Sequence, residues 1–161
     1  MPDIVISNTS PIFYLHRLGQ LELLHRFYGR ILVPEAVAEE LKIGRDQGED
    51  VPDISNHDWM EVRSVHVPEV VSLIMDLGPG EAQVLAMALE NPGSLAIIDD
   101  RLARELAQAR DIRVTGTAGI LLKAKQAGYI ESVKSLLNTL IQLDFRLSEP
   151  VVDTILRLAK E

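Results

Sequence analysis

Short apolar runs alternate with longer amphipathic segments along the chain. Each run is rich in Ile, Val and Leu, stops abruptly at polar residues, and has the length of a strand buried on both faces. We expect these strands at residues 3–7, 31–33, 60–67, 94–98 and 112–115. Apolar residues recur at helical spacing between the runs, which predicts an α/β fold with a parallel sheet covered by helices on both faces.

Helices are expected between the strands and after the last one. Their ranges are 11–18, 21–28, from 34 to beyond 41, 68–77, 81–89, 100–110, 117–127, 131–142 and 148–160. Residues 44–58 interrupt this pattern, because they are acidic, polar and rich in turn formers, and we expect a mobile surface loop there.

The helical tail over about 131–161 has no strand to cover. It must bury an apolar run either on its own domain or against a second subunit, and we expect a homodimer. The run comprises Val133, Leu136, Leu137, Leu140 and Ile141.

The length of 161 residues suggests one domain over residues 1–161. Hydrophobic residues make up 47% of the chain and aromatic residues only 4%, so the core is aliphatic and few rings are present to stack on nucleic-acid bases. The net charge of −8 argues against a broad basic surface, although a metal held by carboxylates can offset charge locally. Without cysteine, apolar spans of membrane length or a leader pattern, we expect a cytoplasmic protein that does not enter membranes.

Polar side chains gather where two expected strands end. Asn8 follows the first strand, and Asp99 and Asp100 follow the fourth. In doubly wound sheets, ligands bind outside the carboxyl ends of the strands where the strand order reverses. Glu40 and Glu81, on adjoining helices, complete a group of oxygen ligands without histidine or cysteine, which favours Mg²⁺ or Mn²⁺ and phosphate chemistry.

Each of these residues also has an ordinary structural explanation. Asp99 or Asp100 can cap the helix that follows, and Glu81 can complement the dipole of its helix. Glu40 can lie on a solvated helix face, and Asn8 can serve as a turn or capping residue. No position is decisive alone, so the functional interpretation rests on their joint placement at strand tips and adjoining helices.

Five stretches of the chain resemble PIN-like domains. They are Ser-Asn-Thr-Ser-Pro, Val-Pro-Glu-Ala-Val-Ala-Glu-Glu-Leu, Leu-Gly-Pro-Gly-Glu-Ala-Gln-Val-Leu-Ala, Ala-Ile-Ile-Asp-Asp-Arg-Leu-Ala-Arg and Val-Thr-Gly-Thr-Ala-Gly-Ile-Leu. They occur in family order over about residues 3–158, and are most similar to a prokaryotic branch related to VapC-type toxin ribonucleases.

The resemblance implies a three-layer α/β/α fold with strand order 3-2-1-4-5, in which the first and fourth strands are neighbours. It implies a ribonuclease dependent on Mg²⁺ or Mn²⁺, with RNA as substrate and an antitoxin protein as a partner. Glu40, Glu81 and Asp99 match the acids that hold the metal, Asn8 joins them, and Asp100 is the alternative to Asp99.

Four further residues are expected to contact the substrate. Arg104 can meet a phosphate near the site. Thr115 and Thr117 lie where the family often places a hydroxyl, and Ser10 follows the first strand tip. Arg104 can instead pair with Asp100, and the two threonines can be turn and capping residues.

Asn8 is the departure from the family pattern, because typical active PIN nucleases carry Asp there. An amide oxygen can bind Mg²⁺ but lacks the charge, which leaves open a catalytically weak domain that binds RNA or protein. A third alternative is a flavodoxin-like or other small-ligand α/β domain. It requires an anion cradle, and Gly116-Thr-Ala-Gly119 lacks the longer glycine pattern and the lysine of a phosphate loop.

Overall fold

The computed structural model of the chain describes residues 2–74 and 76–161. Its five strands form one parallel sheet in the order β3-β2-β1-β4-β5, which confirms the expected fold and strand order. The strands are β1 (Val5–Ser7), β2 (Ile31–Pro34), β3 (Met60–Arg63), β4 (Leu95–Ile97) and β5 (Arg113–Thr115). In the register, Ser7 aligns with Ile97 and Ile97 with Thr115, so the ends of β1, β4 and β5 lie at one edge.

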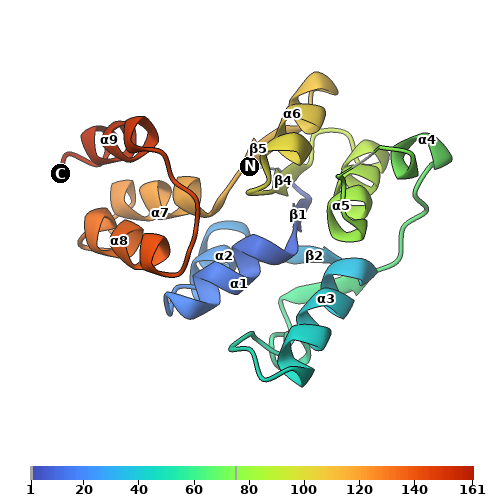
Figure 1. Cartoon of the computed structure of the whole chain (residues 1–161), viewed down its shortest axis with the longest axis horizontal. Helices are drawn as coiled ribbons and strands as arrows, with labels where there is room; N and C mark the ends of the chain where they lie inside the picture. Colours follow the sequence, from blue (N-terminus) through green and yellow to red (C-terminus); the bar gives the residue numbers. More distant parts are fainter. Residues whose placement is uncertain (1, 75) are drawn as a thin grey trace. The chain divides into compact units, whose positions relative to one another are not determined.

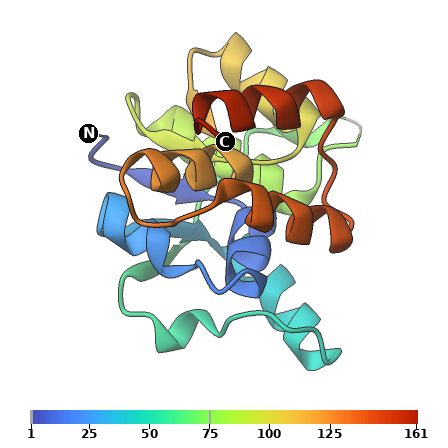
Figure 2. The ribbon, with the colours of Figure 1, turned by 90° about the vertical axis from the view of Figure 1, so that its left-hand side faces the viewer.

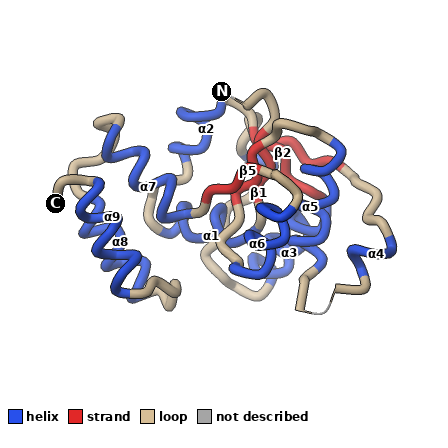
Figure 3. The backbone as a smooth tube through the Cα atoms, turned by 90° about the horizontal axis from the view of Figure 1, so that it is seen from above, coloured by secondary structure: helices blue, strands red, loops and turns tan. Residues whose placement is uncertain are grey.

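Helices cover the sheet because its central strands are apolar on both faces. Figure 1 shows α5 on the opposite side of β1 and β2 from α1 and α2, and Figure 3 shows the strands enclosed by helices. No helix in the described ranges is long and apolar enough to cross a membrane. The helices up to β5 are α1 (Thr9–Arg17), α2 (Glu22–Tyr28), α3 (Glu35–Asp46), α4 (Glu69–Ser72), α5 (Pro79–Glu90) and α6 (Arg101–Ala109).

The region between α3 and α5 differs from the expectation. Strand β3 ends at Arg63 instead of residue 67, because it is an edge strand with only Met60 buried. A helix was expected over 68–77, of which residue 75 lies outside the described residues. The structure shows only α4 there, and its side chains bury too little apolar surface to stabilise more than one turn.

The expected loop at 44–58 is partly ordered by local structure. Its first residues continue α3 to Asp46, and a short 3₁₀ helix spans Ile54–Asn56. Val51 and Ile54 are buried, and His16 Nε2 lies 2.9 Å from Asp50 Oδ1. The mobility of this segment stays a prediction.

The chain divides into two compact units, Met1–Thr115 and Gly116–Glu161. The second unit consists of α7 (Thr117–Gln126), α8 (Val133–Gln142) and α9 (Glu149–Leu158), which pack side by side in Figure 2. The apolar run of the tail is largely buried, with Ile141 exposed at 46%. The buried members are Val133, Leu137 and Leu140.

Candidate metal centre

Asn8 lies at the end of β1 with its side chain buried. Its backbone N–H donates to the Ile97 carbonyl at 3.0 Å, which joins the ends of β1 and β4 as expected. The residue is only 3% exposed, and its Oδ1 atom has no hydrogen-bond partner among the described residues. A buried polar atom without a partner costs about 1–3 kcal/mol, so this oxygen is an uncompensated acceptor. Asn8 precedes α1 at the capping position, but its side chain makes no capping hydrogen bond.

Glu40 is half-buried on α3 and is held by two donors. The Thr9 hydroxyl donates to its Oε2 at 2.5 Å, and the Gly80 backbone N–H donates to its Oε1 at 3.2 Å. The second donor belongs to the first turn of α5, where the helix dipole favours a negative charge. These contacts fix the carboxylate in one orientation, which a side chain on a solvated helix face would lack.

Gly80 shows that Asn8 and Glu40 converge on one point. A Cβ atom placed on Gly80 would lie 3.1 Å from Asn8 Oδ1 and 2.8 and 3.2 Å from the two Glu40 oxygens. Because Gly80 has no side chain, these three oxygens can approach the backbone at the start of α5 closely. We call Asn8 Oδ1, the Glu40 carboxylate and the Gly80 backbone the oxygen cradle.

The two aspartates after β4 have different partners. The Ser10 hydroxyl donates to Asp99 Oδ2 at 2.7 Å, which ties the end of β4 to α1. Asp100 Oδ2 accepts the Ala103 N–H at 2.9 Å and caps α6. The capping role that either residue could have filled thus belongs to Asp100, while Asp99 turns toward the end of β1.

The Glu81 carboxylate folds back over the start of its own helix. Its Oε2 atom lies 2.6 Å from where a Cβ on Gly78 would be, and no described contact joins it to the oxygen cradle. The described residues contain no group of three His, Cys, Asp or Glu side chains that could hold a metal. The oxygens that the structure brings together are thus an amide and a carboxylate.

Arg104 and Thr115, two of the residues expected to contact the substrate, form hydrogen bonds with the backbone of Ile98, next to Asp99. Arg104 Nη1 donates to the Ile98 carbonyl at 3.4 Å instead of pairing with Asp100, and the Thr115 carbonyl accepts the Ile98 N–H at 2.8 Å. Thr117 is buried at the start of α7 and belongs to the second unit.

The oxygen cradle fits a hard divalent cation. Carboxylate and amide oxygens are ligands that Mg²⁺ and Mn²⁺ accept, and a cation would satisfy the unpartnered Asn8 oxygen. Sequence reasoning missed Thr9 and Gly80, which orient Glu40 by donating hydrogen bonds to its carboxylate. The sequence could have indicated these two residues only by their positions, since Thr9 adjoins Asn8 and Gly80 adjoins Glu81.

Comparison with known families matches this chain to one of them over almost its whole length. The model of the family DUF3368, described as a PIN domain, matches residues 4–161. No curated protein matches the chain.

Proposed function

Since the chain belongs to the PIN domain family, we propose that it is a metal-dependent ribonuclease that hydrolyses RNA phosphodiester bonds. The fold of this family is of the nuclease type, and its members generally depend on divalent metal. The observation that carries the proposal is the unpartnered Asn8 oxygen, which converges with the oriented Glu40 carboxylate beside Gly80. A purely structural arrangement would have supplied a donor to the Asn8 oxygen.

Asn8 and Glu40 would hold the cation, with Asp99 joining from the neighbouring strand end. Glu81 would complete the ligands by turning away from its place beside Gly78. When bound, Mg²⁺ or Mn²⁺ polarises a phosphoryl oxygen and makes a water molecule a better nucleophile at neutral pH. Thr9 and the Gly80 N–H keep Glu40 in place before the substrate arrives. Ser10 does the same for Asp99, so the carboxylates need little reorganisation.

The substrate would approach the ends of β1, β4 and β5. Arg104 lies one helical turn after Asp100 and can offer its guanidinium to a phosphate. Ser10 and Thr115 carry the hydroxyls proposed for further contacts. Action on RNA would place the protein in the cytoplasm, and the likeness to toxin ribonucleases suggests an antitoxin that restrains it.

Cleavage of a single-stranded RNA with Mn²⁺, with Mg²⁺ and with chelator tests the proposal. We expect cleavage only with metal, and a loss on the order of a hundredfold or more in Glu40→Gln, because one charged group at such a centre contributes that much. Glu39→Gln is the matched control, since Glu39 is exposed on the same helix and should leave cleavage unchanged. Metal-independent cleavage, or equal loss in both variants, would refute the assignment.

The two aspartates sharpen the same experiment. Asp99→Asn should reduce cleavage strongly, because it removes a carboxylate at the strand end. Asp100→Asn should keep most of the activity, because Asn caps a helix about as well as Asp. The reverse result would transfer the ligand role to Asp100.

A second candidate is a catalytically weak PIN domain that binds RNA or a protein. Asn8 favours it, since an amide in place of a carboxylate removes one negative charge from the centre. It predicts metal binding and RNA binding without cleavage, which the same samples reveal in a gel-shift assay.

A further inference from the structure

Helix α1 begins beside the oxygen cradle, directly after β1 (Figure 1). Its first two residues, Thr9 and Ser10, donate hydrogen bonds to two of the carboxylates proposed as metal ligands. Phe13 follows Thr9 by four positions and Arg17 follows Ser10 by seven, so these four residues share one face of the helix. At a rise of about 1.5 Å per residue, Arg17 lies about 10 Å beyond Ser10 along the helix axis.

The Arg17 guanidinium is oriented by two contacts within the chain. Its Cζ atom lies 4.3 Å from the centroid of the Phe13 ring, in a cation–π contact. Its Nε–H group donates to the Asp50 carbonyl at 3.3 Å. The Phe13 ring packs edge-on against the Tyr14 ring, with centroids 4.9 Å apart. The guanidinium is therefore held in place before any ligand arrives.

The two terminal nitrogens of Arg17 have no partner in the part of the chain that the structure describes. Arg17 forms no ion pair there, although the chain holds 24 acidic residues. Asp50 offers Arg17 only its carbonyl, because the Asp50 carboxylate contacts His16 Nε2 at 2.9 Å. An oriented guanidinium with free terminal nitrogens presents the paired donors with which arginine binds phosphate groups.

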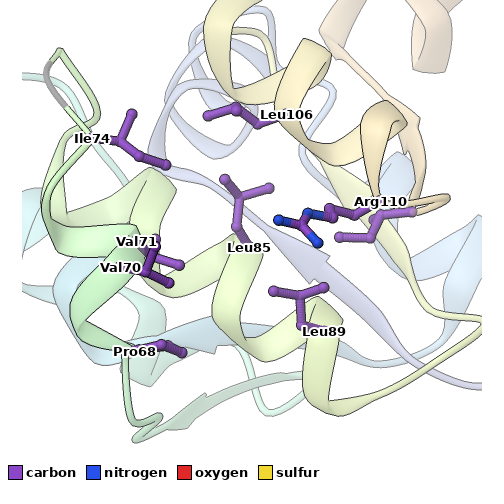
Figure 4. Close-up of a pocket in the computed structure, with 9 residues that line it drawn as sticks. Pro68, Val70, Val71, Ile74, Leu85, Leu89, Leu106 and Arg110 are labelled. Atoms are coloured by element: carbon purple, nitrogen blue, oxygen red, sulfur yellow. The ribbon is translucent and has the colours of Figure 1, made fainter.

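Two other arginines lack this combination. Within residues 2–74 and 76–161, Arg110 also forms no ion pair, but it points toward Leu85 and Leu89 in an aliphatic pocket of about 260 Å³ (Figure 4). Arg104 already uses one terminal nitrogen to donate to the Ile98 carbonyl. Arg17 differs from both, because a ring and a carbonyl fix it while both terminal nitrogens stay available.

We propose that Arg17, held by Phe13, binds a backbone phosphate of single-stranded RNA at a distance from the phosphodiester that is cleaved. The inference rests on the proposed function, because a strand with one phosphate at the oxygen cradle would reach Arg17 by extending along α1. The net charge of −8 gives the strand no general attraction to this protein, so a local contact with two donors has to hold it. The contact fixes the direction in which the strand leaves the metal centre.

Binding of a labelled single-stranded oligouridylate, measured by fluorescence anisotropy with chelator and at increasing salt, tests this subsite. Arg17→Gln should weaken binding at least about tenfold, because a charged hydrogen bond to phosphate is lost. The slope of log affinity against log salt should fall in magnitude by about 0.7, the value for one phosphate contact on a single strand. Arg30→Gln is the matched control, since Arg30 is exposed just before β2, at the opposite end of the sheet, and should leave both quantities unchanged.

Two further variants separate an oriented guanidinium from a positive charge alone. Arg17→Lys should keep the salt slope of wild type but recover only part of the affinity, because an ammonium group lacks the planar pair of donors. Phe13→Leu should weaken binding less than Arg17→Gln and leave the salt slope unchanged, because the charge remains but loses the ring that orients it.

Four results would overturn the proposal. They are a wild-type chain that does not bind the RNA; equal affinity and slope in wild type and Arg17→Gln, as expected if Arg17 serves a protein partner; an equal loss in Arg30→Gln; and full affinity in Arg17→Lys. Circular dichroism melts identify a variant that fails to fold, and Arg17→Met then replaces Arg17→Gln. None of these measurements uses metal or cleavage, so RNA that binds through Arg17 without being cleaved would refute the nuclease and not the subsite.

Discussion

The surroundings of two carboxylates, Glu161 and Glu40, differ in how completely their hydrogen-bond acceptors are satisfied. The Glu161 side chain accepts the N–H groups of Val133 and Lys134 at 2.7 and 3.2 Å and the Ser132 hydroxyl at 3.0 Å. Lys125 Nζ lies 3.6 Å from it. At the oxygen cradle, Glu40 has two donors, but the adjacent Asn8 oxygen has none.

This difference separates a structural role from a binding role. Every partner of Glu161 lies within the chain, so it completes the start of α8 and needs nothing from outside. The hydrogen bond from Val133 is the largest of the causes that hold the pKa of the Glu161 carboxyl below its usual value. At the oxygen cradle the acceptors outnumber the donors, and the proposed cation would be the missing partner of the Asn8 oxygen.

Closing the oxygen cradle should have the largest effect. Gly80→Ala places a Cβ in the space shared by Asn8 and Glu40, so the affinity for Mn²⁺ should fall at least about tenfold, or 1.4 kcal/mol. The metal-free fold should survive, because Ala is a better helix former than Gly by up to about 1 kcal/mol. Calorimetric titration with Mn²⁺ measures the affinity.

Gly119→Ala provides the control for this substitution. Gly119 is exposed in α7, so the same change of residue tests helix propensity without the oxygen cradle. Equal Mn²⁺ affinities for wild type and Gly80→Ala would show that the oxygen cradle is not the metal site.

Removing the charge of Glu161 should weaken the second unit without affecting metal binding. Because the folded-state pKa is lowered, the charge contributes stability above the unfolded pKa of about 4.5, and this contribution disappears as the pH falls through the folded pKa. Glu161→Gln should therefore melt below wild type at neutral pH, and the gap should close in acid. Amide hydrogen exchange at Val133 and Lys134 should accelerate in the variant.

Glu149→Gln is the comparison variant for Glu161→Gln. Glu149 lies in the first turn of α9, and its carboxylate accepts no hydrogen bond in the described part of the chain. Removing its charge should therefore change stability little at any pH. A pH-independent gap for Glu161→Gln would contradict a role for the charge.

The sheet and its strand ends could be predicted from the sequence because they follow from local pattern. Apolar runs that stop at Asn8 and Asp99 place both residues at the carboxyl ends of parallel strands, and the strand order makes these ends neighbours. The burial of the tail was also readable, since its apolar residues recur at helical spacing.

The orientation of single side chains could not be predicted, because it depends on contacts between distant elements. Gly80 meets Glu40 only because α5 packs against α3, and Glu81 turns toward Gly78 instead of that contact. The short α4 was missed for a related reason. Helix propensity over 68–77 does not show whether Val70 and Leu73 pack against another part of the protein.

Asn8→Asp tests the central claim, that the oxygen cradle binds a divalent cation. The added carboxylate should be repelled by Glu40 in the metal-free protein and should bind a cation more tightly than the amide does. Bound metal stabilises the native state by about 2.7 kcal/mol when its concentration is a hundred times Kd, so changes in affinity are visible in melting curves.

The measurement is a set of thermal melts of wild type and Asn8→Asp, each with chelator and with Mn²⁺. We predict that wild type is stabilised by Mn²⁺, and that Asn8→Asp melts lower than wild type with chelator but gains more from the metal. If Asn8 only shapes the turn before α1, Asp and Asn serve about equally well. Both proteins would then give the same melting curve under each condition, and the oxygen cradle would not be a metal site.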